Sequence, residues 1–224
     1  MSVAVQQDVV KRLSKFYSHS ANLASFEVQI DGTGGTAKLA QQPNGFRLNT
    51  DDQAEVALIF PNGLATARLA PYPGWEALRD RALANWTEWR RASPARQPTR
   101  IGVRYVNRID VPIEGEAGKI SLSKYLEFRP LVPNISGQRP FAGYMQQVTL
   151  PTDTPPWSAT ITSAVVAPPP LLNHISLLLD IDLFRTAEIP ANEDELWKLV
   201  DGVRGLKNRI FESCITDEAR KLFA

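Results

Sequence analysis

Hydrophobic and polar positions repeat along this chain with two different periods, and the switches between these periods predict its elements. Val5, Val9, Leu13 and Phe16 recur at helical spacing, which predicts a short amphipathic helix that ends near Ser18. The period then becomes two, and turn residues separate the apolar runs. We expect short strands over residues 25–30, 36–40, 45–49, 55–60 and 65–69.

Three segments rich in glycine, asparagine or proline lie between these strands: Asp31–Gly35, Pro43–Gly45 and Pro61–Gly63. Such segments are typical of hairpin turns, so the strands should pair in antiparallel fashion. The first segment lacks the Lys-Ser/Thr ending of a phosphate-binding loop, and no helical pattern follows it. We therefore interpret it as a turn as well.

A core helix and a strand of unusual charge follow. Trp75, Trp86 and Trp89 share one stripe of a helix expected to end near residue 91. From residue 100 to 111 the side chains then alternate strictly, as in a strand with one apolar face. Arg100, Arg104 and Arg108 lie on one face, and Ile101, Val103, Tyr105, Ile109 and Val111 lie on the other.

The rest of the chain predicts a connection, a meander and a long helix. Residues 112–140 are rich in proline and glycine, so we expect an irregular, mobile loop with one short helix near residues 122–126. A capping box at Asn192 and a second cap at Thr216 predict two helices. The extended runs cover residues 141–150, 157–167 and 173–184, and the long helix has an apolar stripe of Leu196, Leu199, Val203, Leu206, Ile210 and Cys214.

This order of elements predicts an α+β fold with antiparallel sheets in two similar halves, each packed against a long amphipathic helix. We expect a single compact domain over residues 1–224, or two intimately packed halves over residues 1–111 and 112–224.

Composition places the chain among ordinary globular proteins. Its 224 residues are 43% hydrophobic and 22% charged, and the net charge of +1 gives no global attraction to nucleic acid or an anionic membrane. Cys214 is the only cysteine, which excludes an internal disulfide and suits a reducing compartment. We find neither a signal-peptide pattern nor an apolar run that would span a bilayer. These features predict a cytoplasmic protein without membrane contact.

The three arginines form either a salt-bridged surface or an anion-binding wall. Residues four apart on a strand are separated by about 13 Å, so three such arginines cannot hold one phosphate together. Asp180 and Asp182 alternate on one face of their strand and are the best candidates for a carboxylate-only magnesium site. We favour the alternative in which they pair with Arg104 and Arg108 across neighbouring strands.

A pocket for an anionic small molecule, such as a nucleotide that is bound or hydrolysed, remains the competing interpretation of this strand. An arginine and a polar residue from another strand would form it, with Gln146, Gln147, Thr160 and Thr162 as candidates for the second group. The candidate ligand-binding residues are Arg100, Arg104, Asn107, Arg108, Asp180 and Asp182.

Other chemistry finds little support in the residues. His19 and His174 are the only histidines, and the chain lacks zinc-ligand spacing and a Gly-x-Ser-x-Gly elbow. Cys214 falls on an apolar helical stripe, which favours a buried structural thiol over a nucleophile. The sequence therefore predicts no catalytic residue, no metal site and no cofactor.

Nucleic-acid binding is the third hypothesis, and it rests on the basic segment from residue 76 to 108. This segment holds eight arginines against three acids, a local net charge of +5. Trp86, Trp89 and Tyr105 are interleaved with them, as aromatic residues are in grooves for single-stranded nucleic acid. These aromatic side chains fall on apolar faces, where they would not stack on bases. Arg90, Arg91 and Arg96 are therefore only weak candidates for contacts with nucleic acid.

Four segments together resemble a sporadically distributed family of uncharacterised bacterial proteins. They are Tyr72-Pro73-Gly74-Trp75, the strand Arg100–Ile109, Leu179-Asp180-Ile181-Asp182 and the ending Phe211-Glu212-Ser213-Cys214-Ile215-Thr216. The resemblance covers about residues 70–224 and brings no catalytic residue with it. Sporadic distribution is typical of genes that move with accessory or defence loci, so the resemblance implies a role that depends on a partner.

These observations lead to one favoured hypothesis and two alternatives. We expect a non-enzymatic component of a bacterial accessory or defence-related system that works through contacts with another protein. An arginine-lined pocket for an anionic small molecule is the first alternative, and nucleic-acid binding is the second.

Overall fold

The computed structural model describes residues 1–30, 37–93, 97–113, 120–131, 143–166 and 171–223, with the backbone alone for residues 25–30 and 37–42. The chain divides into two compact units, Met1–Gln97 and Pro98–Ala224. The arginine strand therefore belongs to the second unit, whereas the sequence pattern placed it in the first half.

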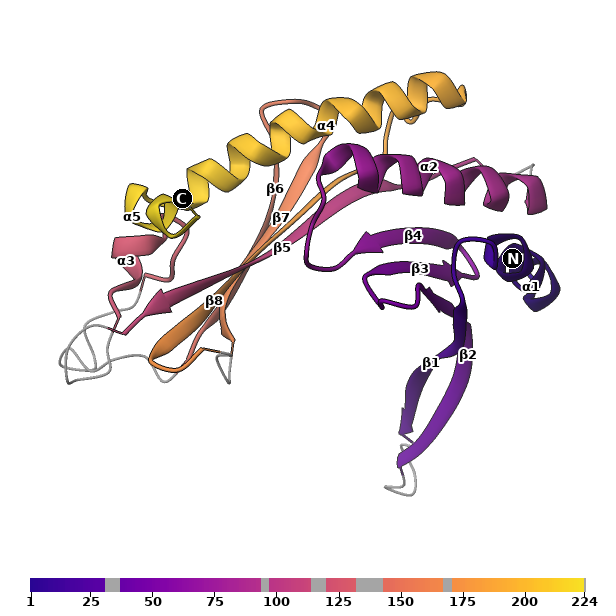
Figure 1. The fold of residues 1–224 in the computed structure, drawn as a ribbon, viewed down its shortest axis with the longest axis horizontal. Coiled ribbons are helices and arrows are strands. Elements are labelled where there is room, and N and C mark those ends of the chain that lie inside the picture. Colours follow the sequence, from indigo (N-terminus) through magenta and orange to yellow (C-terminus); the bar gives the residue numbers. More distant parts are fainter. Residues whose placement is uncertain (31–36, 94–96, 114–119, 132–142, 167–170, 224) are drawn as a thin grey trace. The chain divides into compact units, whose positions relative to one another are not determined.

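The first unit is a four-stranded antiparallel sheet with two helices (Figure 1). The strands follow one another in the order β1-β2-β3-β4, as expected of a meander joined by tight turns. The elements are α1 (Val3–Leu13), β1 (His19–Ile30), β2 (Ala37–Asn49), β3 (Glu55–Phe60), β4 (Gly63–Arg68) and α2 (Trp75–Ala92).

The core of the first unit lies between the sheet and both helices. Val9 and Leu13 of α1 pack with Leu48, Ile59 and Trp89, and all five are at most 5% exposed. The tryptophan stripe predicted for α2 is confirmed, since Trp75 and Trp89 are buried and the ring of Trp86 stacks on that of Trp89 at 5.2 Å.

Two details of the first sheet differ from the predictions. The first strand begins at His19, earlier than residue 25, and β2 runs through Pro43–Gly45, which we had interpreted as a turn. The register shifts opposite Leu23 and Ala24, where Gly45 and Pro43 are the paired residues and Asn44 is the extra one. Proline cannot donate a ladder hydrogen bond, so the segment forms a bulge within one strand instead of ending it. The predicted turn over residues 31–35 lies outside the described residues.

The second unit contains another four-stranded antiparallel sheet, in the order β5-β8-β7-β6. The predicted meander of the last three strands is confirmed, and the arginine strand joins it beside β8. The elements are β5 (Ile101–Pro112), α3 (Leu122–Tyr125), β6 (Met145–Pro151), β7 (Ser158–Val166), β8 (His174–Arg185), α4 (Glu193–Cys214), α5 (Asp217–Arg220) and a 3₁₀ turn η1 (Lys221–Phe223).

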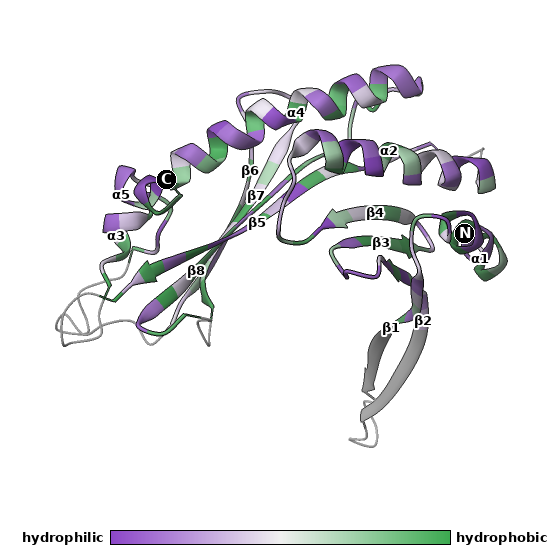
Figure 2. Cartoon of the chain, in the orientation of Figure 1, coloured by the Kyte–Doolittle hydropathy of each residue, from purple (hydrophilic) through white to green (hydrophobic). Residues whose placement is uncertain are grey.

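One face of this sheet carries the apolar core, and α4 packs against that face. Leu177, Leu179, Ile181 and Leu183 alternate along β8 and are all fully buried. The Lys207 ammonium of α4 lies 4.0 Å from the centre of the Tyr105 ring. Apolar and polar positions recur along α4 in Figure 2, as its stripe predicts, and the buried residues of the helix are Leu196, Val203, Leu206 and Cys214.

The end of α4 is joined to the short helix α3. Leu126 and Ile215 form an antiparallel bridge, and the Glu127 amide donates to the Cys214 carbonyl at 2.9 Å. Burial raises the pKa of the Cys214 thiol to about 11. The thiol is therefore protonated at neutral pH, as befits a structural cysteine.

Both units thus have the α+β architecture predicted from the sequence: an antiparallel sheet with a long amphipathic helix packed against it. Within the described residues, none of the helices combines the length and the apolar character needed to cross a membrane.

Candidate functional site

The face of the second sheet that lies opposite α4 carries the arginines, and we call it the arginine face. Because Tyr105 contacts α4, the alternation of β5 turns its even-numbered residues to the other side of the sheet. The arginine face includes Arg104, Val106, Arg108 and Asp110 of β5, Asp180 and Asp182 of β8, Thr160 and Thr162 of β7, and Gln147 and Thr149 of β6, with Arg100 at its end.

Each of the three arginines has a carboxylate partner. The Arg104 Nε donates to both oxygens of Asp180 at 2.9 and 3.1 Å, and its Nη2 donates to Oδ2 at 2.5 Å. The predicted pairing of Arg104 is therefore correct. Arg100 donates from Nη2 to Asp182 at 2.8 Å, and its guanidinium lies 4.8 Å from the centre of the Phe184 ring.

The pairing predicted for Arg108 is wrong, because this residue donates from Nε to Asp110 of its own strand at 3.1 Å. The register explains the change. Leu178 lies directly opposite Arg108. The guanidinium of each arginine extends toward the Pro112 end of β5, and for Arg108 this direction leads away from Asp180 and Asp182.

Charge on the arginine face is balanced but unequally exposed. Three arginines meet three aspartates, so these six groups have no net charge. The Asp180 side chain is only 9% exposed, whereas that of Arg104 is 63% exposed. The hydrogen bonds to Asp180 raise the pKa of Arg104 above its usual value. An anionic small molecule would have to compete with these carboxylates for each guanidinium.

Part of the hydrogen-bonding capacity of the arginines is unused. Nη1 of Arg104 and both Nη atoms of Arg108 donate to none of the described residues. Between these two residues, Val106 is 61% exposed. On the arginine face, β5 therefore presents free guanidinium N–H donors of Arg104 and Arg108 on either side of the Val106 side chain.

The polar groups of β6 and β7 form their own contacts. Thr149 and Thr160 are hydrogen-bonded at 2.8 Å, and the Gln147 Nε2 donates to Thr162 at 2.8 Å. Since β8 lies between β7 and β5, these residues do not complete a pocket with the arginines. Gln146 lies on the opposite face.

Two other groups of candidates are not brought to this face. Asn107 lies on the side of Tyr105, where its Nδ2 donates to the Leu179 carbonyl at 3.0 Å. Arg91 pairs with Glu88 at 2.7 Å, and the guanidinium of Arg90 lies 5.7 Å from the centre of the Trp86 ring. Arg96 lies outside the described residues.

The outer edge of β5 is the most distinctive feature of the site. This strand pairs with β8 over twelve residues without a bulge, and no described strand pairs with its other side. Edge strands are usually shortened, bulged or interrupted by proline, because free N–H and C=O groups recruit other strands. Residues 101–111 contain no proline, so proline does not interrupt this edge for a further extended segment.

Sequence reasoning missed the exposed apolar position and the aromatic partner of Arg100. Val106 could have been found, since it has the same parity as Arg104 and Arg108. Phe184 has the same parity as Asp180 and Asp182, which predicts that it shares their face. The free edge itself required knowledge of the strand order.

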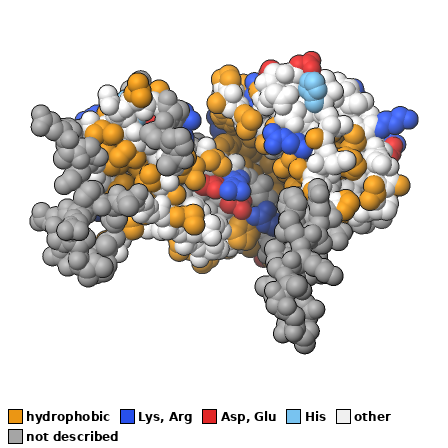
Figure 3. All heavy atoms as spheres, turned by 90° about the horizontal axis from the view of Figure 1, so that it is seen from below, with side chains coloured by type: hydrophobic (Ala, Val, Ile, Leu, Met, Phe, Trp, Pro, Cys, Tyr) orange, Lys and Arg blue, Asp and Glu red, His pale blue; other side chains and the backbone are white. Residues whose placement is uncertain are grey.

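Charged side chains of both signs lie side by side in the view of Figure 3, among apolar ones. Within the described parts of the chain, no group of three or more His, Cys, Asp or Glu residues is placed to hold a metal ion.

Fold and site together define a two-unit α+β protein with an arginine-lined edge strand. Comparison with protein-family models, curated proteins and solved structures gave no match.

Proposed function

We propose that this chain acts by binding another protein, and that the partner adds an extended segment to the outer edge of β5. The observation that carries the proposal is the outer edge of β5, with which no described strand pairs and which is flanked by half-exposed guanidiniums with free donors. Main-chain hydrogen bonds supply affinity in this mode of recognition, and alternate side chains supply specificity.

The side chains of β5 indicate the chemistry of the segment. Arg104, Val106 and Arg108 follow one another on the same face, two residues apart. A strand added beside them would place its own alternate side chains next to these three. In the added segment, acidic residues at the first and fifth positions would complement the two arginines, and an apolar residue at the third position would contact Val106.

The resemblance to a sporadically distributed bacterial family supports the wider role that we propose, as a component of an accessory or defence-related system. This wider role rests on that resemblance alone. The role in protein binding rests on the geometry of the second unit.

A labelled peptide tests the binding mode. The probe is an acetylated peptide with the core Glu-Thr-Val-Thr-Glu, titrated by fluorescence anisotropy at low salt. We expect saturable binding that weakens about fivefold on Arg108→Gln, since an exposed ion pair contributes up to about 1 kcal/mol. Lys198→Gln is the matched control, because it removes an exposed cation of α4.

A second peptide, with the core Gln-Thr-Val-Thr-Gln, separates charge from strand pairing. It should bind more weakly to the wild-type protein and equally to both variants. Binding that is the same for Arg108→Gln and for the wild type, or no binding of the acidic peptide, would overturn the proposal. Val106→Pro should weaken the binding of both peptides, because it removes an N–H group from the middle of the strand.

A further inference from the structure

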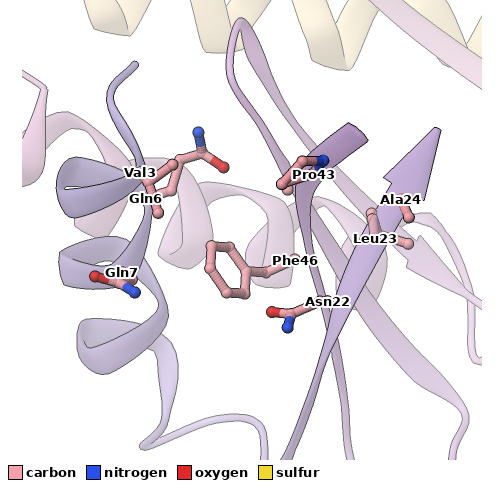
Figure 4. A pocket seen from close by; sticks show the side chains of 9 residues that line it. Val3, Gln6, Gln7, Asn22, Leu23, Ala24, Pro43 and Phe46 are labelled. Atoms are coloured by element: carbon pink, nitrogen blue, oxygen red, sulfur yellow. The ribbon is translucent and has the colours of Figure 1, made fainter. Parts of the chain in front are cut away.

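A cavity of about 420 Å³ lies in the first unit, between α1 and the bulged part of β1 and β2 (Figure 4). Val3 and Gln6 line it from the helix side, and Leu23, Pro43 and Phe46 line it from the strands. Its volume falls in the range of sites for small molecules, about 300–1,000 Å³. The cavity lies within a single unit and is remote in sequence from the arginine strand.

The bulge that shapes this cavity is fixed by Gly45. This residue has φ +124°, and a Cβ atom added to it would lie 1.9 Å from the Ile59 carbonyl oxygen. Only glycine fits such a position without moving the neighbouring strand. A bulge bends its strand, so the Leu23 and Pro43 region departs from the flat path of the sheet beside α1.

Gln6 places a hydrogen-bond acceptor at this cavity. The residue is only 3% exposed, and its Nε2 donates to the Met1 carbonyl at 3.3 Å. Its Oε1 accepts no hydrogen bond from the described residues. In Figure 4 the Gln6 amide points away from α1, into the space between the helix and Pro43. A ligand with a donor group would replace solvent at this acceptor with a direct hydrogen bond.

The remaining lining defines the rest of the ligand. None of the lining residues carries a charge, so a charged ligand would gain no ion pair here. The amides of Gln7 and Asn22 also line the cavity, and both residues are exposed. Val3, Leu23, Pro43 and Phe46 offer apolar contacts. We infer that this cavity binds a small, uncharged and mainly apolar molecule through one N–H or O–H group that donates to Gln6.

Indole and 1-methylindole form a matched pair of probes, since they differ in the N–H donor and one methyl group. Binding is measured by titration of the isotope-labelled full chain, with amide NMR signals of α1 and of residues 44–46 as the readout. We expect indole to shift these signals and to bind about fivefold more tightly than 1-methylindole, as one net hydrogen bond of about 1 kcal/mol predicts.

Two variants tie the result to the cavity. Gln6→Leu should bind both probes equally, because it removes the acceptor. Val3→Trp should block both probes by filling the space, and it changes a residue that is 55% exposed, so the fold is preserved. Lys11→Trp, at an exposed position of the same helix outside the lining, is the matched control and should bind as the wild type does.

Three results would overturn the inference: no shift of these signals with indole, equal affinity of the wild type for both probes, or unchanged indole binding by Val3→Trp. Peptide binding at β5 involves the other unit, so either proposal can fail while the other holds.

Discussion

The two units have the same kind of sheet and helix but place their polar groups differently. In the first unit, Asn85 of α2 is fully buried and donates from Nδ2 to the Tyr17 hydroxyl at 2.6 Å and to Thr66 of β4 at 2.9 Å. In the second unit, Arg104 and Asp180 lie on the face opposite the helix. Polar contacts therefore join helix to sheet in the first unit and line an outer surface in the second.

Ion pairs follow the same division. Glu55 of β3 lies between Arg68 and Arg81 at 3.2 and 2.7 Å, and the guanidinium of Arg81 also lies 4.8 Å from the Phe16 ring centre. These three charged side chains are at most 27% exposed, whereas Arg100, Arg104 and Arg108 on the arginine face are at least 50% exposed. The difference teaches that the ion pairs around Glu55 serve packing, whereas those of the arginine face leave a usable surface.

The largest effect is expected at Asn85. Asn85→Ala removes the donor to Tyr17 and Thr66 and leaves a cavity, so the free energy of unfolding should fall by about 1–3 kcal/mol. Urea denaturation followed by tryptophan fluorescence measures it. Asn208→Ala, at an exposed asparagine of α4, should change stability by less than about 0.5 kcal/mol. Equal stability of the two variants would remove the contrast between buried and exposed polar groups.

The Arg104–Asp180 pair should respond asymmetrically. Arg104→Met leaves a carboxylate that is 9% exposed without its guanidinium, which should cost about 1–3 kcal/mol. Asp180→Asn leaves a guanidinium that is already 63% exposed to water, so the cost should stay below about 1 kcal/mol. Denaturation midpoints of both variants and of the double variant measure the difference, and the reverse order would contradict it.

Acid should weaken the first unit in part through Glu88. The hydrogen bond from Lys15 lowers the pKa of Glu88, and the Arg91 charge acts in the same direction. A lowered pKa in the folded state stabilises the protein above the usual glutamate pKa, and this stabilisation is lost as pH falls through the folded value. Between neutral pH and about pH 3, Glu88→Gln should therefore lose less stability than the wild type. Parallel stability curves would contradict the assignment.

The smallest effect should be a gain. Gly202 and Gly205 lie in the interior of α4 with open space where a Cβ would be, so each change to alanine should stabilise the protein by about 0.5–1 kcal/mol. Gly45→Ala gives the opposite sign, because its Cβ would collide with the backbone of β3. Thermal unfolding of the three variants measures both directions, and a loss of stability at Gly202 or Gly205 would show that α4 needs these glycines.

Much of the fold follows from the sequence, because long amphipathic patterns specify an element locally. The stripe of α4 and the alternation of β5 are such patterns, and both elements are present with bounds close to those expected. Pro43–Gly45 misled because the same residue types suit a turn and a bulge. Whether the segment forms a turn or a bulge depends on how β2 pairs with the neighbouring strands β1 and β3, and a local sequence pattern does not contain this information.

The site was less predictable, since its charges are neutralised by residues distant in sequence. The local charge of +5 over residues 76–108 suggested a basic surface. In the structure, Arg81 pairs with Glu55, Arg100 with Asp182 and Arg104 with Asp180. Strand order decides which carboxylate meets which guanidinium, and strand order is a property of the whole sheet.

The rate at which Cys214 reacts with a thiol reagent reports local opening of the second unit. Cys214 has the only thiol in the chain, it is 4% exposed, and its pKa of about 11 keeps it protonated at neutral pH. A thiol reagent can react quickly only when the end of α4 separates from α3, so the labelling rate counts these openings. A peptide that binds to β5 and stabilises the second unit should therefore lower the labelling rate of Cys214, even when the peptide itself carries no label.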